Sequence, residues 1–350
     1  MIAGRVIAAL DATPLTVPTG GVKRYTEELA QALAANYTGD EYWLLSDQQF
    51  DMPAHTPANL HKGDGPRTAA ERRWWLWGLE REMMRRGVGV FHGTDFSVPY
   101  IPRRPSVMTV HDLSPWLFKE GSLRVRRRMP VLLRARVPTM IITPSEAIRR
   151  AAISRFGLDG ERVVAVPLAA SNHFYPVETA PPSRPYFLFV GTLEPRKNIA
   201  GLIEAWREVR KSQDVDLVLA GRVRDGFPPL APEPGLRILG AVQEEDLPAL
   251  YSGAVACVYP SLYEGFGLPV LEAMQCGATV IASRDPAILE VSGGAAIHVE
   301  ATDVRALAEA MLARPERREE SLKRAALFSW TVTARKTREV YDAARRYFSK

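Results

Sequence analysis

The chain has 350 residues, enough for two domains with full hydrophobic cores, and its 46% hydrophobic and 24% charged residues are ordinary for a globular protein. Its formal net charge of +5 is compatible with anionic substrates or an anionic membrane surface, but the excess is too small and too scattered to indicate nucleic-acid binding. No apolar run approaches the roughly 20 residues of a membrane span, and the two cysteines lack metal-ligand spacing, so we expect a cytoplasmic protein without a signal peptide.

Short apolar runs alternate with helical patterns along the chain, which predicts an α/β protein with parallel sheets covered by helices. The first ten residues predict a buried strand, and the apolar residues of segment 22–33 repeat at helical spacing. Gly20 and Gly21 precede this helix. A helix start with two glycines can bind an anion, although the spacing alone favours a simple turn.

A strand is predicted at 42–45, followed by a loop at 52–69. The segment 72–77, Arg-Arg-Trp-Trp-Leu-Trp, then mixes basic and large aromatic residues at the start of a helix. Two interpretations stay open: a helix that buries one aromatic face, or a patch that contacts an anionic membrane from the side, because Trp and Arg favour the headgroup region. Further arginines favour the membrane contact, namely Arg124, Arg126, Arg127, Arg128, Arg134 and Arg136.

Two histidines follow predicted buried strands in this half of the chain. His92 comes after the strand 88–91, and a lone histidine in such a place is usually structural. His111 comes after the strand 107–110, at a carboxyl end, where open α/β sheets bind their ligands. Strands at 140–142 and 163–166 complete this half, and the proline-rich stretch 179–185 predicts an interdomain linker.

A second domain is predicted to begin with the continuous apolar strand 186–190. Arg196 and Lys197 lie in the turn between this strand and a helix at 199–209. Cations at a helix start oppose the positive end of the helix dipole, so their placement indicates an anionic ligand. An adjacent Arg-Lys pair is, however, more often a solvated surface feature.

Further along, the apolar run 254–259 leads into a glycine-containing loop and a helix that Gly277 ends. Gly265 and Gly267 have no Cβ, so a ligand can lie close to the backbone, and the helix start favours an anion. Two carboxylates flank this turn: Glu264 in the loop and Glu272 in about the first turn of the helix. Taken alone, Glu272 would be a residue that stabilises a helix start.

The stretch from Glu264 to Glu272 resembles the Glu-x7-Glu signature of the retaining glycosyltransferases of the GT-B fold, in particular family 4. The resemblance is dense from about residue 187 to residue 344 and sparse before. It implies two Rossmann-like domains that face a cleft, with the acceptor on residues 1–178 and the nucleotide sugar on residues 179–335. Residues 336–350 would form a helix that packs back on the first domain.

The resemblance also implies roles for individual residues. It assigns the donor sugar to Glu264 and the ribose to Glu272. The Gly-Thr-x-x-x-Arg-Lys-Asn segment is similar to one that holds the nucleotide diphosphate through Arg196 and Lys197. The segment with His111 is similar to one whose histidine lies beside the transferred sugar. The other donor-binding residues that it implies are Gly20, Gly21, Val242, Gly265, Phe266, Gly267 and Leu268.

The expected reaction is retaining, metal-independent transfer of a hexosyl group to a glycan or a lipid-linked saccharide in polysaccharide synthesis. GDP-mannose is the expected donor, and UDP-glucose is the alternative. The Asp214-Val215-Asp216 motif falls at the start of a predicted strand, away from the carboxyl ends, so neither a metal nor a cofactor beyond the donor is expected. Three other classes stay open: a sugar-nucleotide epimerase of the same fold, a retaining glycosidase, and a non-catalytic nucleotide-sugar-binding subunit.

Overall fold

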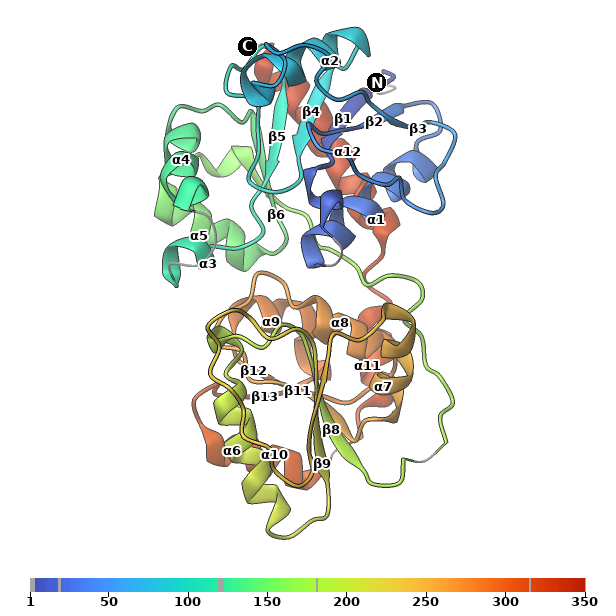
Figure 1. Cartoon of the computed structure of the whole chain (residues 1–350), viewed down its shortest axis with the longest axis vertical. Helices are drawn as coiled ribbons and strands as arrows, with labels where there is room; N and C mark the ends of the chain where they lie inside the picture. The colour runs from blue at the N-terminus through green and yellow to red at the C-terminus, as the bar shows by residue number, and fades with distance from the viewer. Residues whose placement is uncertain (1–3, 18–19, 119–122, 181, 315, 350) are drawn as a thin grey trace. The chain divides into compact units, whose positions relative to one another are not determined.

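The computed structural model describes the chain except residues 1–3, 18–19, 119–122, 181, 315 and 350 and the side chain of Arg124. It divides into two compact units: unit 1 comprises Met1–Leu168 and Ser329–Lys350, and unit 2 comprises Ala169–Phe328. Each unit has its own sheet of parallel strands with helices packed around it (Figure 1). The predicted α/β class with two Rossmann-like sheets is confirmed.

Unit 1 is built on a seven-stranded sheet in which the paired strands are parallel. Its strands are β1 (Ile7–Asp11), β2 (Glu41–Leu45), β3 (Leu60–Lys62), β4 (Val90–Gly93), β5 (Ser106–Thr109), β6 (Met140–Thr143) and β7 (Val163–Ala165). Their order is β3-β2-β1-β4-β5-β6-β7, so the chain moves outwards from β1 to one side and then, from β4, to the other. Ligands of open α/β sheets bind at such a reversal, beyond the carboxyl ends of the strands.

The helices of unit 1 include one from the far end of the chain. They are α1 (Gly21–Asn36), α2 (Leu79–Arg85), α3 (Ser114–Leu117), α4 (Leu123–Arg134), α5 (Glu146–Phe156) and α12 (Trp330–Phe348). The C-terminal helix α12 packs against α1 and the strands β4 to β6 (Figure 1). Buried polar contacts fix it there: Arg338 Nε donates to Asp40 Oδ2 at 2.6 Å, and the Tyr341 hydroxyl lies 2.8 Å from His92 Nδ1. The predicted return of the C-terminal helix to the first domain is confirmed.

Unit 2 repeats the same topology with six strands. They are β8 (Tyr186–Val190), β9 (Asp216–Ala220), β10 (Leu236–Gly240), β11 (Ala256–Tyr259), β12 (Val280–Ser283) and β13 (Ile297–Val299), in the order β10-β9-β8-β11-β12-β13. Its helices are α6 (Ile199–Arg210), α7 (Leu247–Gly253), α8 (Leu268–Gln275), α9 (Pro286–Ser292), α10 (Val304–Ala313) and α11 (Arg318–Ala325). Every residue of β8, β9, β11 and β12 is buried, as continuous apolar runs in a parallel sheet require. The order reverses between β8 and β11.

The boundaries between the units differ from those that the sequence predicts. The first lies at 168/169 instead of 178/179, because Gln275 Nε2 donates to the carbonyls of Ser171 (2.9 Å) and Phe174 (2.8 Å) and so ties the following segment to unit 2. The second lies at 328/329 instead of 335/336, because α12 already begins at Trp330. The proline-rich stretch 179–185 therefore belongs to unit 2.

Three local features of unit 1 also differ. The predicted loop 52–69 contains β3, a three-residue strand that pairs with β2. The helix predicted at 72–77 is a π-helix (Trp74–Gly78) that continues into α2. A Cβ at Gly78 would lie 2.1 Å from the Glu71 carbonyl oxygen, so the glycine permits this tight turn. His92 lies inside β4 and not after it.

Candidate active site

The candidate site lies at the reversal of strand order in unit 2. The loop after β8 contains a 3₁₀ turn (Pro195–Lys197), and the loop after β11 spans residues 260–267. The backbone N–H of Leu262 donates to the Arg196 carbonyl at 2.8 Å, which joins the two loops. The fold therefore brings two segments that are more than 60 residues apart in the chain to the same edge of the sheet, where ligands of such sheets bind.

Glu264 is the centre of a buried ionic cluster. Its Oε1 accepts from Lys197 Nζ at 2.5 Å and from Ser261 Oγ at 2.7 Å, and its Oε2 accepts from Arg196 Nη1 at 3.3 Å. Burial alone would raise the pKa of Glu264, but the charges of Lys197 and Arg196 outweigh it and hold the pKa below the usual range. We call these four residues the Glu264 cluster; its carboxylate is ionised at neutral pH.

A second carboxylate extends the cluster on the other side of Arg196. Glu194, which is buried, accepts from Arg196 Nη2 and from Arg224 Nη1, both at 2.6 Å. Arg224 follows β9, and the backbone of Leu193 pairs with this segment. The sequence prediction missed Glu194 and Arg224. Their position could have indicated them, because both follow the carboxyl ends of neighbouring strands, where such sheets bind ligands.

The loop from Gly265 to Leu268 leads directly into α8. Gly267 is the N-cap of this helix with φ 98°, a left-handed conformation that favours glycine. Phe266 is buried and packs edge-on against Phe328, with the ring centroids 6.0 Å apart. The N–H of Glu264 donates to Asp285, which also caps α9, so the loop is held from both sides. The N-cap of α8 thus follows Glu264 closely in the chain.

Glu272 and Val242 lie apart from this cluster. Glu272 is the fifth residue of α8, at the end of about its first turn, as the sequence predicts. It is only 2% exposed, and its Oε2 accepts from the Tyr251 hydroxyl at 3.0 Å. Val242 is half-buried in the loop after β10. Asp214 and Asp216 lie at the amino end of β9, where both pair with Arg184.

His111 belongs to unit 1, just beyond the carboxyl end of β5. Its Nε2 lies 2.7 Å from the Thr94 carbonyl, which can only accept, so Nε2 donates this hydrogen bond and Nδ1 is the other ring nitrogen. The ring packs edge-on against Tyr25 with the centroids 4.8 Å apart. His92, by contrast, is fully buried, and burial lowers its pKa to about 3, so its role is structural.

A carboxylate that the sequence prediction missed lies at the carboxyl end of β1. Asp11 is buried and accepts from Ser97 Oγ at 2.5 Å and from Thr13 Oγ1 at 2.6 Å. Burial raises the pKa of Asp11 to about 6. It lines a cavity of about 310 Å³ that Asp95 and Trp75 also line.

Gly20 and Gly21 lie at the start of α1, in the same unit. Gly20 is the N-cap with φ 145°, in the region that favours glycine, and Gly21 is the first helical residue. A Cβ at either position would meet no atom of the described chain within 4 Å, so both border open space.

The aromatic and basic segment 72–77 has features of both interpretations, the buried aromatic face and the membrane-contacting patch. Trp74 is buried in the core with Phe91 and Met83, whereas Trp77 is 42% exposed and lies under Arg103. The basic helix α4 lies nearby, since its Arg128 contacts the ring of Tyr100 and lines a cavity together with Trp75. Of the described helices, none has both the length and the hydropathy needed to cross a membrane.

The fold is that of the GT-B glycosyltransferases, and comparisons with known proteins identify the family. Residues 19–171 match the family model described as "Glycosyltransferase Family 4". Residues 184–314 match the family model described as "Glycosyl transferases group 1". The chain belongs to this glycosyltransferase family. It is 33% identical to O-antigen chain mannosyltransferase B of Escherichia coli over 347 residues, which cover 85% of this chain and 88% of the relative.

Two further comparisons extend this assignment. The chain is 30% identical to the MMP α-(1→4)-mannosyltransferase of Mycolicibacterium hassiacum over 246 residues, 65% of this chain and 57% of the relative. A sucrose-phosphate synthase from Thermosynechococcus elongatus is similar in structure, with a TM-score of 0.73, 22% identity, and coverage of 99% of this chain and all of the other, which shows the fold. These results favour glycosyl transfer over the epimerase, glycosidase and non-catalytic alternatives.

Proposed function

We propose that the chain is a retaining mannosyltransferase that transfers mannose from GDP-mannose to a glycan or lipid-linked saccharide in the cytoplasm, as a step of polysaccharide synthesis. The observation that carries the proposal is the Glu264 cluster at the reversal of strand order in unit 2, which gathers two cations and one carboxylate beside a helix start. The choice of mannose rests on the two mannosyltransferase relatives, whereas GDP as the nucleotide is the expectation from the sequence resemblance.

Arg196 and Lys197 stabilise the leaving diphosphate in this proposal, together with the N–H groups at the start of α8. Each cation at about 4 Å contributes on the order of 4 kcal/mol of attraction before desolvation, at an effective dielectric of about 20. The electron pair of the bond between the anomeric carbon and the phosphate oxygen leaves with the diphosphate. The acceptor hydroxyl adds to the same face, and its proton passes to the departing phosphate oxygen. Glu264 accepts hydrogen bonds from sugar hydroxyls.

The remaining roles follow from position. Glu272 accepts from the ribose hydroxyls, and Val242 borders the base. His111 supports the transferred sugar through Nδ1, and Gly20 and Gly21 let the substrates approach the start of α1. No enzyme nucleophile is required.

Competition between GDP and UDP tests the donor, and a chelator tests the metal. We expect GDP to bind at least tenfold more tightly than UDP in a calorimetric titration. A clear preference for UDP would contradict GDP-mannose as the donor.

Transfer is expected to continue unchanged in EDTA, because Arg196 and Lys197 would stabilise the charge of the leaving diphosphate in place of a divalent ion. Activity that stops in EDTA and returns with Mg²⁺ or Mn²⁺ would contradict transfer without a metal ion.

We further propose that the surface formed by Leu76, Trp77 and the exposed side of α4 contacts anionic lipid, because it combines exposed apolar residues with arginines. The wild-type protein is expected to co-sediment with vesicles that contain phosphatidylglycerol but much less with pure phosphatidylcholine. Trp77→Ala should reduce this binding severalfold, whereas Leu327→Ala, a change at an exposed residue of unit 2, should not. Equal loss in both variants, or no binding by the wild type, would contradict the contact.

A further inference from the structure

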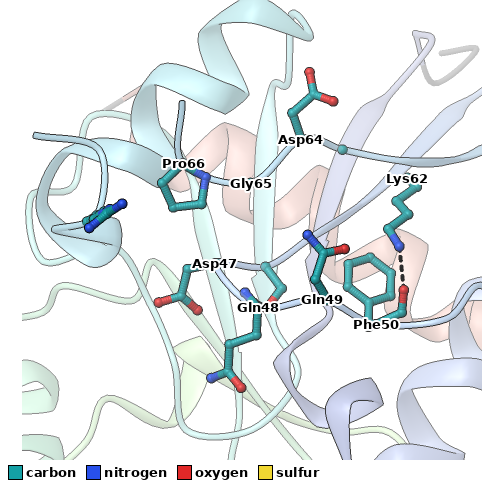
Figure 2. A pocket seen from close by; sticks show the side chains of 11 residues that line it. Asp47, Gln48, Gln49, Phe50, Lys62, Asp64, Gly65 and Pro66 are labelled. Carbon is teal, nitrogen blue, oxygen red and sulfur yellow. Dashed lines mark hydrogen bonds between the residues drawn. The ribbon is translucent and has the colours of Figure 1, made fainter. Parts of the chain in front are cut away.

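A large cavity opens at the carboxyl ends of β2 and β3 in unit 1. Its volume is about 670 Å³, within the usual range for ligand pockets. Figure 2 shows residues 47–50, which follow β2, along one wall and residues 62–66 along the other. Arg72 completes the lining. None of these residues belongs to the Glu264 cluster, and the roles proposed above do not use them.

The lining suits a neutral ligand with many hydroxyl groups. Gln48 and Gln49 are exposed at its wall, and each amide offers both donors and acceptors, as hydroxyls require. Asp47 and Arg72 add one acceptor group and one donor group of opposite charge. Lys62 donates to the Phe50 carbonyl (Figure 2) and also lies over the ring of the same residue.

The charges of the lining balance. The lining holds two carboxylates, Asp47 and Asp64, and two cations, Lys62 and Arg72. Asp64 also pairs with Arg67 and Arg86, which do not line the cavity. The formal charges of the lining residues therefore cancel, and a saccharide, unlike an anion, needs no cationic excess.

This cavity adjoins the one at the carboxyl end of β1. Ser46 lines the larger cavity, and its Oγ lies 3.4 Å from Thr13 Oγ1, which lines the smaller cavity beside Asp11. Because β3, β2 and β1 are neighbours in the sheet, the two cavities follow each other along one edge. The smaller cavity lies at the reversal of strand order, and the larger one lies farther out.

We propose that the larger cavity is a distal acceptor subsite that binds sugar residues behind the residue that receives mannose. This inference rests on the proposed function, since it presumes a saccharide acceptor on unit 1. It means that the enzyme senses acceptor length: an acceptor with several sugar residues fills both cavities, whereas a monosaccharide fills only the inner one.

The test compares methyl α-mannoside with methyl α-mannotrioside as acceptors. For the wild type, we expect KM to be at least tenfold lower for the trisaccharide. Gly65→Leu is designed to fill the cavity, since a Cβ at Gly65 meets no atom of the described residues within 4 Å, and Arg72→Ala removes a lining donor. Both variants should raise KM for the trisaccharide to the monosaccharide value and leave the monosaccharide KM and kcat unchanged. Matched controls outside the lining, Gly39→Leu and Arg73→Ala, should behave as the wild type.

Equal KM values for the two acceptors in the wild type, or variants that raise both values together, would overturn the subsite while transfer itself persists. If neither acceptor receives mannose, the proposed function fails in this form, and saturation-transfer NMR with the trisaccharide alone decides the subsite. Signals that vanish in Gly65→Leu and remain in Gly39→Leu support it. Unchanged or absent signals, or displacement of the trisaccharide by inorganic phosphate, contradict it.

Discussion

The Lys197→Ala variant is expected to lose about 10²- to 10³-fold in kcat, the usual loss when one group that stabilises developing negative charge is removed. Lys197 is buried, and its Nζ lies 2.5 Å from Glu264 Oε1. The variant removes a cation from the proposed diphosphate site and also leaves Glu264 with a weaker set of partners. Steady-state kinetics with saturating GDP-mannose measures the effect.

Binding distinguishes the diphosphate contact from a general loss of structure. We expect Lys197→Ala to weaken GDP at least tenfold and guanosine less than twofold, because only GDP carries the phosphates. Lys197→Arg should recover part of the affinity. Lys211→Ala, at an exposed lysine beyond α6, serves as the control and should match the wild type. Equal losses for GDP and guanosine would show that Lys197 does not meet the diphosphate.

The second large effect separates the two glutamates. Glu264→Gln should lower kcat/KM for GDP-mannose by roughly ten- to a hundredfold, since a hydrogen bond to a charged group contributes about 1.5 to 3 kcal/mol. Its affinity for GDP should not fall, because the sugar is absent from GDP and the change removes only the ion pairs that Glu264 makes with Lys197 and Arg196. Glu272→Gln should instead weaken GDP and GDP-mannose alike, because both carry the ribose.

Calorimetry with GDP and kinetics with GDP-mannose on both variants decide this assignment, and Glu208→Gln at an exposed position is the control. Matching losses of GDP affinity in the two variants would contradict the division of roles. Unchanged behaviour in Glu272→Gln would mean that Glu272 is a structural partner of Tyr251, to which it is hydrogen-bonded.

Much of the sheet architecture could be predicted from the sequence. The continuous apolar run at 186–190 coincides with β8, and the run 42–45 falls within β2, because strands buried on both faces leave a strong local signal. The helix predicted after the glycine-containing loop is α8, with Gly267 as its N-cap. Short elements were less predictable: β3 has only three residues, including His61 and Lys62, and pairing with β2 rather than composition makes it a strand.

The electrostatics of the candidate site could be predicted only in part. The sequence places Arg196 and Lys197 in a turn and Glu264 in another, but their pairing across 67 and 68 positions depends on the adjacency of β8 and β11. Glu194 and Arg224 were missed for the same reason, since their contact exists only in the folded sheet. The structure brings Glu264, Arg196 and Lys197 together, and the roles assigned to these and to all other site residues remain predictions.

The measurement that tests the central proposal most directly is a time course by NMR of GDP-mannose with methyl α-mannoside, for the wild type and Lys197→Ala. We predict that the wild type consumes the donor, releases GDP and forms a new mannoside whose anomeric carbon–hydrogen coupling shows the α configuration of the donor, while Lys197→Ala does so at least a hundredfold more slowly. A β-configured product, release of free sugar or its epimer without a new glycosidic bond, or an equal rate in Lys197→Ala would contradict the proposal.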